Sequence, residues 1–158
     1  VYYTTWIDNA ITYTNSTYTN TQGTSTRKGV ELNYAHELTQ AWHHDIGAHW
    51  SVAQDSEHTQ LLRRPRWTLN NSVSKTVDTY TTTLVHTYTG EHVDLDATTY
   101  ARKVMPGVHT FDLHHTVYFD ASTSISTSIR NITDESYESP DGYAQHGRNF
   151  VITYSLKF

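Results

Sequence analysis

The sequence predicts an all-β chain that folds as an antiparallel, up-and-down transmembrane β-barrel of eight strands. The first observation is composition, because only 17% of the residues are charged and 12 of the 158 are Tyr, whereas soluble domains carry about 25% charged residues. The second is a period of two in the apolar residues. The third is that the opposite face carries mainly Ser, Thr, Asn, His and Gly, where a soluble β-domain would show Lys and Glu, so the apolar face is expected to contact lipid.

The period of two is clearest at the C-terminus, where one face of a strand carries Phe150, Ile152, Tyr154, Leu156 and Phe158. The same alternation recurs at 111–119 and 42–52, where His115 and His44 interrupt the apolar face. Applied in order to the whole chain, this alternation predicts eight strands at residues 2–13, 18–38, 42–55, 62–76, 79–91, 108–119, 122–132 and 147–158.

The connections between these predicted strands alternate in length. The tight ones are 39–41, 77–78 and 120–121, and the longer ones are 14–17, 56–61, 92–107 and 133–146. Short turns at one end and long loops at the other are typical of a meander that closes into a barrel. An aromatic girdle near the strand ends would comprise Tyr34, Trp42, Trp50, Trp67, Tyr80, Tyr88 and Tyr154. The length predicts one domain spanning residues 1–158.

Charge and composition exclude several classes of protein. Eleven Lys and Arg against 16 Asp and Glu give a net charge of −5, and no basic block follows that could bind nucleic acid. The longest apolar runs fall far short of the roughly 20 residues of a membrane-spanning helix or the about 7 to 15 of a signal peptide, so the chain is expected to start mature or within a longer protein. Without Cys, no disulfide framework is expected.

Short motifs point to a family. The ending FVITYSLKF resembles the C-terminal signal by which outer-membrane barrels are recognised for insertion, carried by the alternating residues from Phe150 to Phe158. The stretch RNITDESYE at 130–138, followed by Gly142-Tyr143 and by GRNF at 147–150, resembles the penultimate loop of TonB-dependent outer-membrane receptors.

Further motifs of this family occur in the expected order: RKGVEL at 27–32, LLRRPRW at 61–67 and FDLHHTVYF at 111–119. The run LLRR is similar to the corresponding stretch of the family's cobalamin receptors. The resemblance implies about the last eight strands of a 22-stranded transporter, without the plug domain, the TonB box or the first strands.

The resemblance also implies a function and a location. The function is uptake of a scarce nutrient, such as cobalamin or an iron chelate, driven through TonB. The location is the outer membrane of a Gram-negative bacterium, with both termini and the tight turns periplasmic. The implied partners are the bilayer with its lipopolysaccharide, the barrel-assembly machinery and, only within a complete receptor, TonB.

Two other functions stay open. Eight strands could close on themselves into a small barrel with a structural or surface-binding role, whose interior is just wide enough for side chains. A soluble β-barrel that binds a ligand is the third alternative. In a closed barrel the lumen would be filled by Glu31, Asn33, Glu37, His43, Asp45, His49, Asn70, Asp112, His114, Tyr118, Arg130 and Lys157, and its stability would depend on pH.

The long loops, extracellular in this orientation, supply the candidate ligand-binding residues Tyr100, Arg102, Tyr137 and Tyr143. Arg63, Arg64 and Arg66 either contact lipopolysaccharide or simply mark the end of the hydrocarbon band. No metal site is expected, because His43, Asp45 and His49 share a strand face without the spacing of a ligand set. Nor does a nucleophile elbow occur, so no catalytic residue, enzyme activity or cofactor is predicted.

Overall fold

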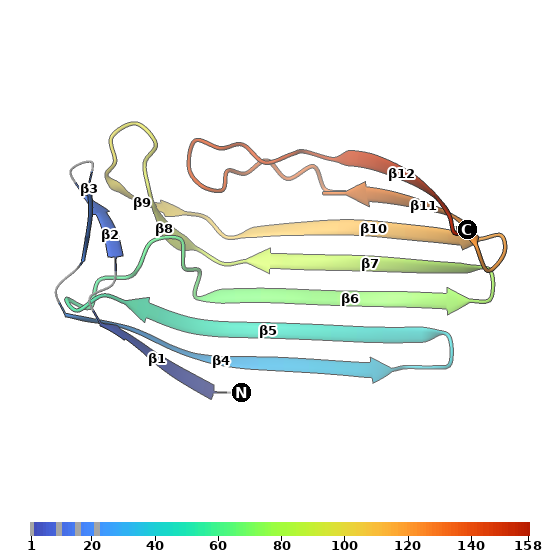
Figure 1. The fold of residues 1–158 in the computed structure, drawn as a ribbon, viewed down its shortest axis with the longest axis horizontal. Coiled ribbons are helices and arrows are strands. Elements are labelled where there is room, and N and C mark those ends of the chain that lie inside the picture. Colours follow the sequence, from blue (N-terminus) through green and yellow to red (C-terminus); the bar gives the residue numbers. More distant parts are fainter. Residues whose placement is uncertain (1, 9–10, 15–16, 21–22) are drawn as a thin grey trace.

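The computed structural model describes residues 2–8, 11–14, 17–20 and 23–158, and they form an open antiparallel sheet with small hairpins at one end (Figure 1). The order in the sheet is β1-β4-β5-β6-β7-β10-β11-β12. Its strands are β1 (Tyr2–Asp8), β4 (Thr24–Glu37), β5 (Trp42–Gln54), β6 (Trp67–Val77), β7 (Tyr80–Thr89), β10 (Val108–Tyr118), β11 (Thr123–Arg130) and β12 (Asn149–Leu156). Two separate hairpins are formed by β2 (Ile11–Thr14) with β3 (Thr17–Asn20) and by β8 (His92–Leu95) with β9 (Arg102–Met105).

The all-β, antiparallel, up-and-down arrangement confirms the sequence prediction, but closure into an eight-stranded barrel is not observed. In the sheet of the described residues β1 and β12 are the two edges, and no pairing joins them. Each inner strand pairs with two neighbours in the sheet, whereas β1 pairs only with β4 and β12 only with β11 among the described strands. Among the described residues, no helix is long and apolar enough to cross a membrane.

The predicted strand boundaries were wrong mainly where the chain folds into extra hairpins. The range 2–13 covers β1 and most of β2, the range 18–38 covers most of β3 and all of β4, and the predicted loop 92–107 contains the β8–β9 hairpin. Continuous Thr and Tyr alternation hides these breaks, whereas Gly23, with a φ of 94°, precedes the start of β4. Residues 9–10, 15–16 and 21–22 of the predicted strands and loop lie outside the described residues.

The register gives the sheet one apolar and one polar face. One row across the apolar face joins Leu84, Leu113, Ile129 and Phe150 on four successive strands. The adjacent row on the polar face joins Glu37, His43, Ser74, Thr83, His114 and Ser128. The alternation that predicted the two faces is therefore confirmed across the sheet.

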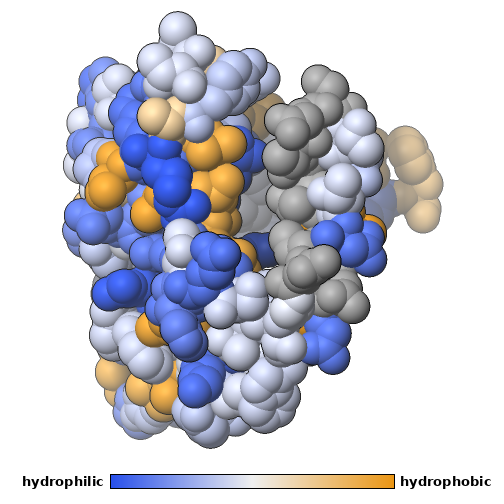
Figure 2. Space-filling model, turned by 90° about the vertical axis from the view of Figure 1, so that its left-hand side faces the viewer, coloured by the Kyte–Doolittle hydropathy of each residue, from blue (hydrophilic) through white to orange (hydrophobic). Residues whose placement is uncertain are grey.

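The apolar face has almost no protein cover within the described residues. The buried hydrophobic side chains among the described residues are Ala53, on the polar face of β5, and Met105, in the β8–β9 hairpin, whereas Leu84, Phe150 and Ile152 on the apolar face are exposed. A sheet that exposes so many large apolar side chains needs another apolar medium against that face. Seen from the end with the long connections, hydrophilic side chains cover much of the surface and apolar ones form separate patches (Figure 2).

The two ends of the sheet differ as the connection lengths predict. Long connections and both small hairpins gather at one end, and the tight turns lie at the other, near the C-terminus (Figure 1). We call these the loop end and the turn end. The loop end brings together the connections 55–66, 90–107 and 131–148, which are far apart in sequence.

Candidate functional site

A buried carboxylate, Asp94, ties the three long connections of the loop end together. Its side chain is 0% exposed. It accepts hydrogen bonds from Nε of Arg63 at 2.8 Å, from the backbone N–H of Leu95 at 2.8 Å and from that of Asp141 at 3.1 Å. Since these donors come from all three connections, one side chain fixes their relative positions.

Two opposing effects act on the pKa of Asp94. Burial disfavours the charged carboxylate and by itself raises the pKa. The hydrogen bonds from Arg63, Leu95 and Asp141 favour the charged form and outweigh burial, so the pKa of Asp94 lies below its ordinary value. Asp94 is therefore a carboxylate at neutral pH, in spite of its burial.

A second acidic residue, Asp141, extends this network. Its carboxylate accepts a hydrogen bond from Nζ of Lys103 at 2.7 Å and another from the backbone N–H of Ala97 at 2.9 Å. The Lys103 ammonium lowers the pKa of Asp141, and Asp141 in turn raises the pKa of Lys103. The β8–β9 hairpin, which carries Lys103, is thus fastened to the connection between β11 and β12.

A hollow of about 390 Å³ lies beside this network. It is lined by Arg63, Leu95, Asp96, Ala97, Tyr100, Asp141, Gly142 and Tyr143. Tyr100 and Tyr143 are 75% and 67% exposed, so their rings are available to a ligand. Aromatic faces next to a guanidinium and carboxylates can bind a polar ligand with flat or ring-shaped parts.

The structure brings together two of the four predicted binding residues. Tyr100 and Tyr143 line the same hollow. Arg102 instead donates a hydrogen bond to the backbone carbonyl of Gln60, and the backbone carbonyl of Tyr137 accepts one from Gln145 at 2.9 Å. Whether any of the four binds a ligand stays a prediction.

Sequence reasoning missed Asp94, Asp141 and Lys103. The only local signal is weak, because Asp94 alternates with Val93 and Leu95 as a strand residue would. Nothing in the sequence shows that an acid in one connection would meet donors from two others.

The three arginines of the predicted lipopolysaccharide contact lie in different surroundings. Arg63 binds Asp94, and together with Arg64 it lines a hollow of about 220 Å³ beside the polar face. Arg66 lines another of about 260 Å³ with Tyr88 and Glu91. A contact with lipopolysaccharide stays a prediction.

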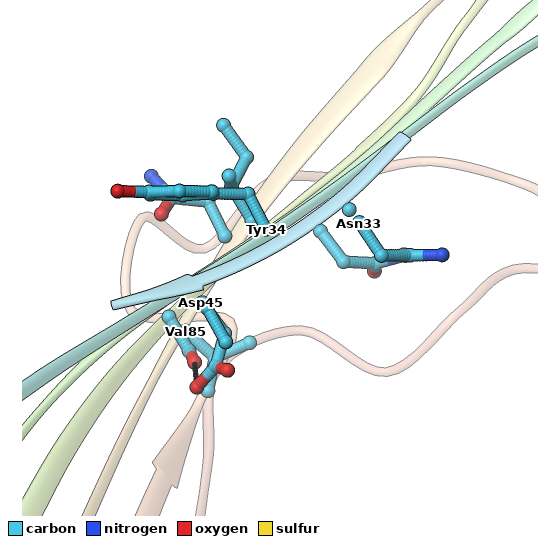
Figure 3. A pocket seen from close by; sticks show the side chains of 10 residues that line it. Asn33, Tyr34, Asp45 and Val85 are labelled. Carbon is cyan, nitrogen blue, oxygen red and sulfur yellow. Dashed lines mark hydrogen bonds between the residues drawn. The ribbon is translucent and has the colours of Figure 1, made fainter. Parts of the chain in front are cut away.

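Another hollow, about 530 Å³, lies in the wall formed by β4, β5, β6 and β7 around Gly47 (Figure 3). Tyr34 projects from one side of β4, whereas Asp45 and Val85 lie on the other side (Figure 3). The absence of a side chain at Gly47 opens the space, since an added Cβ would meet the amide oxygen of Asn33 at 3.0 Å.

Polar contacts connect the side chains predicted to face the lumen. His43 lies between Glu37 and Asp45, with nitrogen-to-oxygen distances of 2.9 and 3.0 Å. His114 contacts the hydroxyl of Ser128 at 2.8 Å. Side chains of neighbouring strands are thus hydrogen-bonded to one another on the polar face.

The C-terminal strand β12 is an edge strand with its apolar side chains uncovered. Phe150, Ile152, Tyr154 and Leu156 project from its apolar face, and all four are exposed. Phe158 follows the end of the strand and is fully exposed. A role of these residues in insertion stays a prediction.

Known proteins resemble this chain in sequence. The family model described as "TonB dependent receptor-like, beta-barrel" matches residues 1–132. The vitamin B12 transporter BtuB of Vibrio cholerae serotype O1 is 28% identical over 156 residues, which are 96% of this chain and 25% of that protein.

Solved structures share the fold. The ferripyoverdine receptor of the outer membrane of Pseudomonas aeruginosa superposes with a TM-score of 0.82 at 17% identity, covering 99% of this chain and 24% of the receptor. The ferric-catecholate import receptor Fiu from Escherichia coli gives 0.76 at 18% identity, covering 98% and 24%. The chain therefore spans about a quarter of the length of the relatives that it matches.

Proposed function

This chain belongs to the TonB-dependent receptor β-barrel family, and from that premise we propose that it is the C-terminal part of the barrel of an outer-membrane transporter for cobalamin or an iron chelate. The family consists of receptors and transporters of the Gram-negative outer membrane. The relatives that support the two ligand classes are a vitamin B12 transporter and receptors for iron complexes.

The observation that carries the proposal is that side-chain hydrogen bonds and ion pairs order the loop end. In it, Asp94 and Asp141 hold three connections in fixed positions beside the hollow lined by Tyr100 and Tyr143. Connections that only link strands need no buried carboxylates with donors from other connections to order them. A fixed, partly aromatic hollow at one end of a barrel wall is suited to capture a ligand before transport.

The proposal includes an orientation in the membrane. The loop end faces the outside of the cell, and the turn end and both termini face the periplasm. The apolar face of the sheet contacts lipid, the loop end lies next to lipopolysaccharide, and the edge strand β12 is the segment that the barrel-assembly machinery recognises. TonB acts on the complete receptor, whose plug lies outside this chain.

A closed eight-stranded barrel with a structural role has less support. Its defining contact would be a pairing between β1 and β12, and the described residues of these strands are the edges of an open sheet. Matches that cover almost the whole chain but a quarter of each relative also favour a segment of a larger barrel.

Uptake by cells tests the proposal. The complete receptor carrying this segment is expressed in a Gram-negative host that lacks its own cobalamin and iron-chelate receptors. We expect accumulation of radiolabelled cyanocobalamin or of an iron-55 chelate, and its loss when TonB is deleted. Accumulation of neither compound, with the receptor present in the outer membrane, would contradict the proposal.

A further inference from the structure

Basic side chains gather on one part of the wall, although the chain as a whole carries a net charge of −5. Arg27 projects from the polar face of β4, His49 from β5, and Arg63 and Arg64 come from the connection between β5 and β6. Together with Ser51, Pro65 and Thr68, they line the hollow of about 220 Å³ described above. We call this hollow the arginine recess.

A neighbouring hollow enlarges the recess toward the loop end. It measures about 170 Å³ and shares Arg27 and Arg64 with the arginine recess. Its other lining residues are mainly small or hydroxyl-bearing, among them Thr5, Ser25 and Ala53. The two guanidinium groups therefore stand between two adjoining spaces, with hydroxyl donors nearby.

The rings of Tyr3 and His49 hold the Arg27 side chain in place. The guanidinium carbon lies 5.3 Å from the centre of the Tyr3 ring, a distance suited to a cation–π contact. Its Nη2 lies 3.2 Å from Nε2 of His49, and the Tyr3 hydroxyl lies 2.5 Å from the same nitrogen. The Tyr3 ring also stacks on His49 with the ring centres 6.0 Å apart. These contacts orient the guanidinium without neutralising its charge.

Among the described residues, one of these three arginines forms an ion pair. Asp94 pairs with Arg63, but no ion pair among the described residues joins Arg27 or Arg64 to a carboxylate. Guanidinium groups present several donors in one plane and bind carboxylate or phosphate through two parallel hydrogen bonds. Positive charges held close together without anions repel each other, and an anion bound between them removes that repulsion.

We propose that the arginine recess is an anion-binding subsite, in which Arg27 and Arg64 take a carboxylate, phosphate or other anionic oxygen group of the transported ligand. This inference rests on the proposed function and narrows it to ligands that carry such a group. The recess lies on the polar face, in the wall below the loop end. A ligand released from the hollow of Tyr100 and Tyr143 would meet it next, since Arg63 lines both spaces.

Binding of simple anions tests the subsite. Pyrophosphate and citrate are titrated into the purified complete receptor in detergent at low ionic strength, and binding is followed by calorimetry. We expect saturable binding that Arg27→Gln or Arg64→Gln weakens at least about tenfold, with Arg27→Lys falling between the wild type and Arg27→Gln because it keeps the charge but loses the planar donors.

Lys28→Gln is the matched control. It removes the same charge from the next residue of β4, whose side chain projects from the opposite face of the sheet. We expect less than about a twofold change. Equal weakening by Lys28→Gln and Arg27→Gln would show general electrostatic attraction and overturn the inference, as would the absence of saturable binding to the wild type. If Arg27→Gln does not fold, Arg64→Gln, in a connection, decides the question.

The uptake assay separates this inference from the proposed function. TonB-dependent uptake that is unchanged in both Arg27→Gln and Arg64→Gln would overturn the subsite and leave the transport function standing. Anion binding that needs both arginines, in a receptor that transports neither cobalamin nor an iron chelate, would overturn the transport function alone.

Discussion

At the scale of the residue, Asp94 determines how the loop end is assembled. A buried carboxylate is stable only with enough donors to replace its lost hydration, and here the donors belong to three separate connections. The sequence predicts Tyr100 and Tyr143 as ligand contacts, and the structure places them in one hollow. It does not predict Asp94, because its partners lie 31 and 47 residues away in sequence.

Replacing Asp94 with Asn keeps the shape of the side chain and removes its charge. The ion pair with Arg63 is lost, and one of the two acceptor oxygens becomes an NH2 group that cannot accept its N–H donor, at a cost of about 1.5 to 3 kcal/mol. We expect backbone amides of the β8–β9 hairpin to exchange hydrogen about 10- to 100-fold faster. Glu91→Gln, an exposed acid beside the same hairpin, is the control. Equal protection in Asp94→Asn and the wild type would show that Asp94 does not hold the connections.

The same network predicts a dependence on pH. The pKa values of Asp94 and Asp141 lie below the ordinary 3.8, so their stabilisation is complete above pH 3.8 and is lost as the pH falls through the lowered values. The pKa of Lys103 lies above the ordinary 10.5, so its contribution is complete below pH 10.5 and is lost as the pH rises through the raised value. The loop end is therefore most ordered between these limits.

A nitroxide spin label measures this order, since the chain contains no Cys. Attached to Thr98→Cys in the β8–β9 connection, it is expected to report constant, restricted motion at intermediate pH and faster motion at both extremes. A label at Glu57→Cys, outside the Asp94 and Asp141 network, is the control. Mobility at position 98 that rises steadily through neutral pH would contradict the assignment.

At the scale of the element, the alternation of apolar and polar residues along each strand determines its two faces. The register of strand pairing places residues of the same kind next to one another across the sheet. The period of two identified the apolar residues of β10 and β12 correctly, because neither strand contains Pro or Gly to interrupt the alternation. It failed where a hairpin repeats the same alternation, as in β8–β9. Turns made of ordinary polar residues carry too little signal to mark such breaks.

Neighbouring residues in the middle of β7 test the two faces. Leu84 is exposed on the apolar face, and Thr83 lies on the polar face. In the complete receptor, Leu84→Arg places a charge in lipid at a cost of about 2 to 4 kcal/mol, so we expect less assembled receptor in the outer membrane. Thr83→Arg faces a polar interior and should assemble nearly normally. The reverse order of the two variants would mean that the faces are assigned the wrong way round.

The C-terminal strand makes a separate prediction. If its exposed apolar residues are the insertion signal, Phe158→Ser in the complete receptor lowers the assembled fraction measured by heat-modifiable mobility. Lys157→Ser changes the adjacent residue without touching that apolar series and should assemble normally. Equal assembly of both variants would show that Phe158 is not part of the signal.

At the scale of the whole molecule, the described residues form an open sheet without a hydrophobic core of its own. Its apolar side chains are covered neither by a second sheet nor by helices among the described residues. Composition and period predicted the transmembrane architecture because the face opposite the apolar one differs between the two classes of protein. It carries small polar residues in a membrane barrel, whereas a soluble β-domain carries Lys and Glu there. Closure could not be predicted, because an edge strand of a fragment and a strand that closes a barrel have the same alternation.

The most direct test of this account is the electrophoretic mobility of the 158-residue chain, refolded alone in detergent and compared with and without boiling. An open wall leaves the backbone groups of β1 and β12 unpaired, so we predict no compact, heat-modifiable monomer from the chain alone, whereas the complete receptor shows one. A heat-dependent shift of the isolated chain at monomer size would mean that eight strands close by themselves, and it would contradict the assignment as one part of a larger transporter barrel.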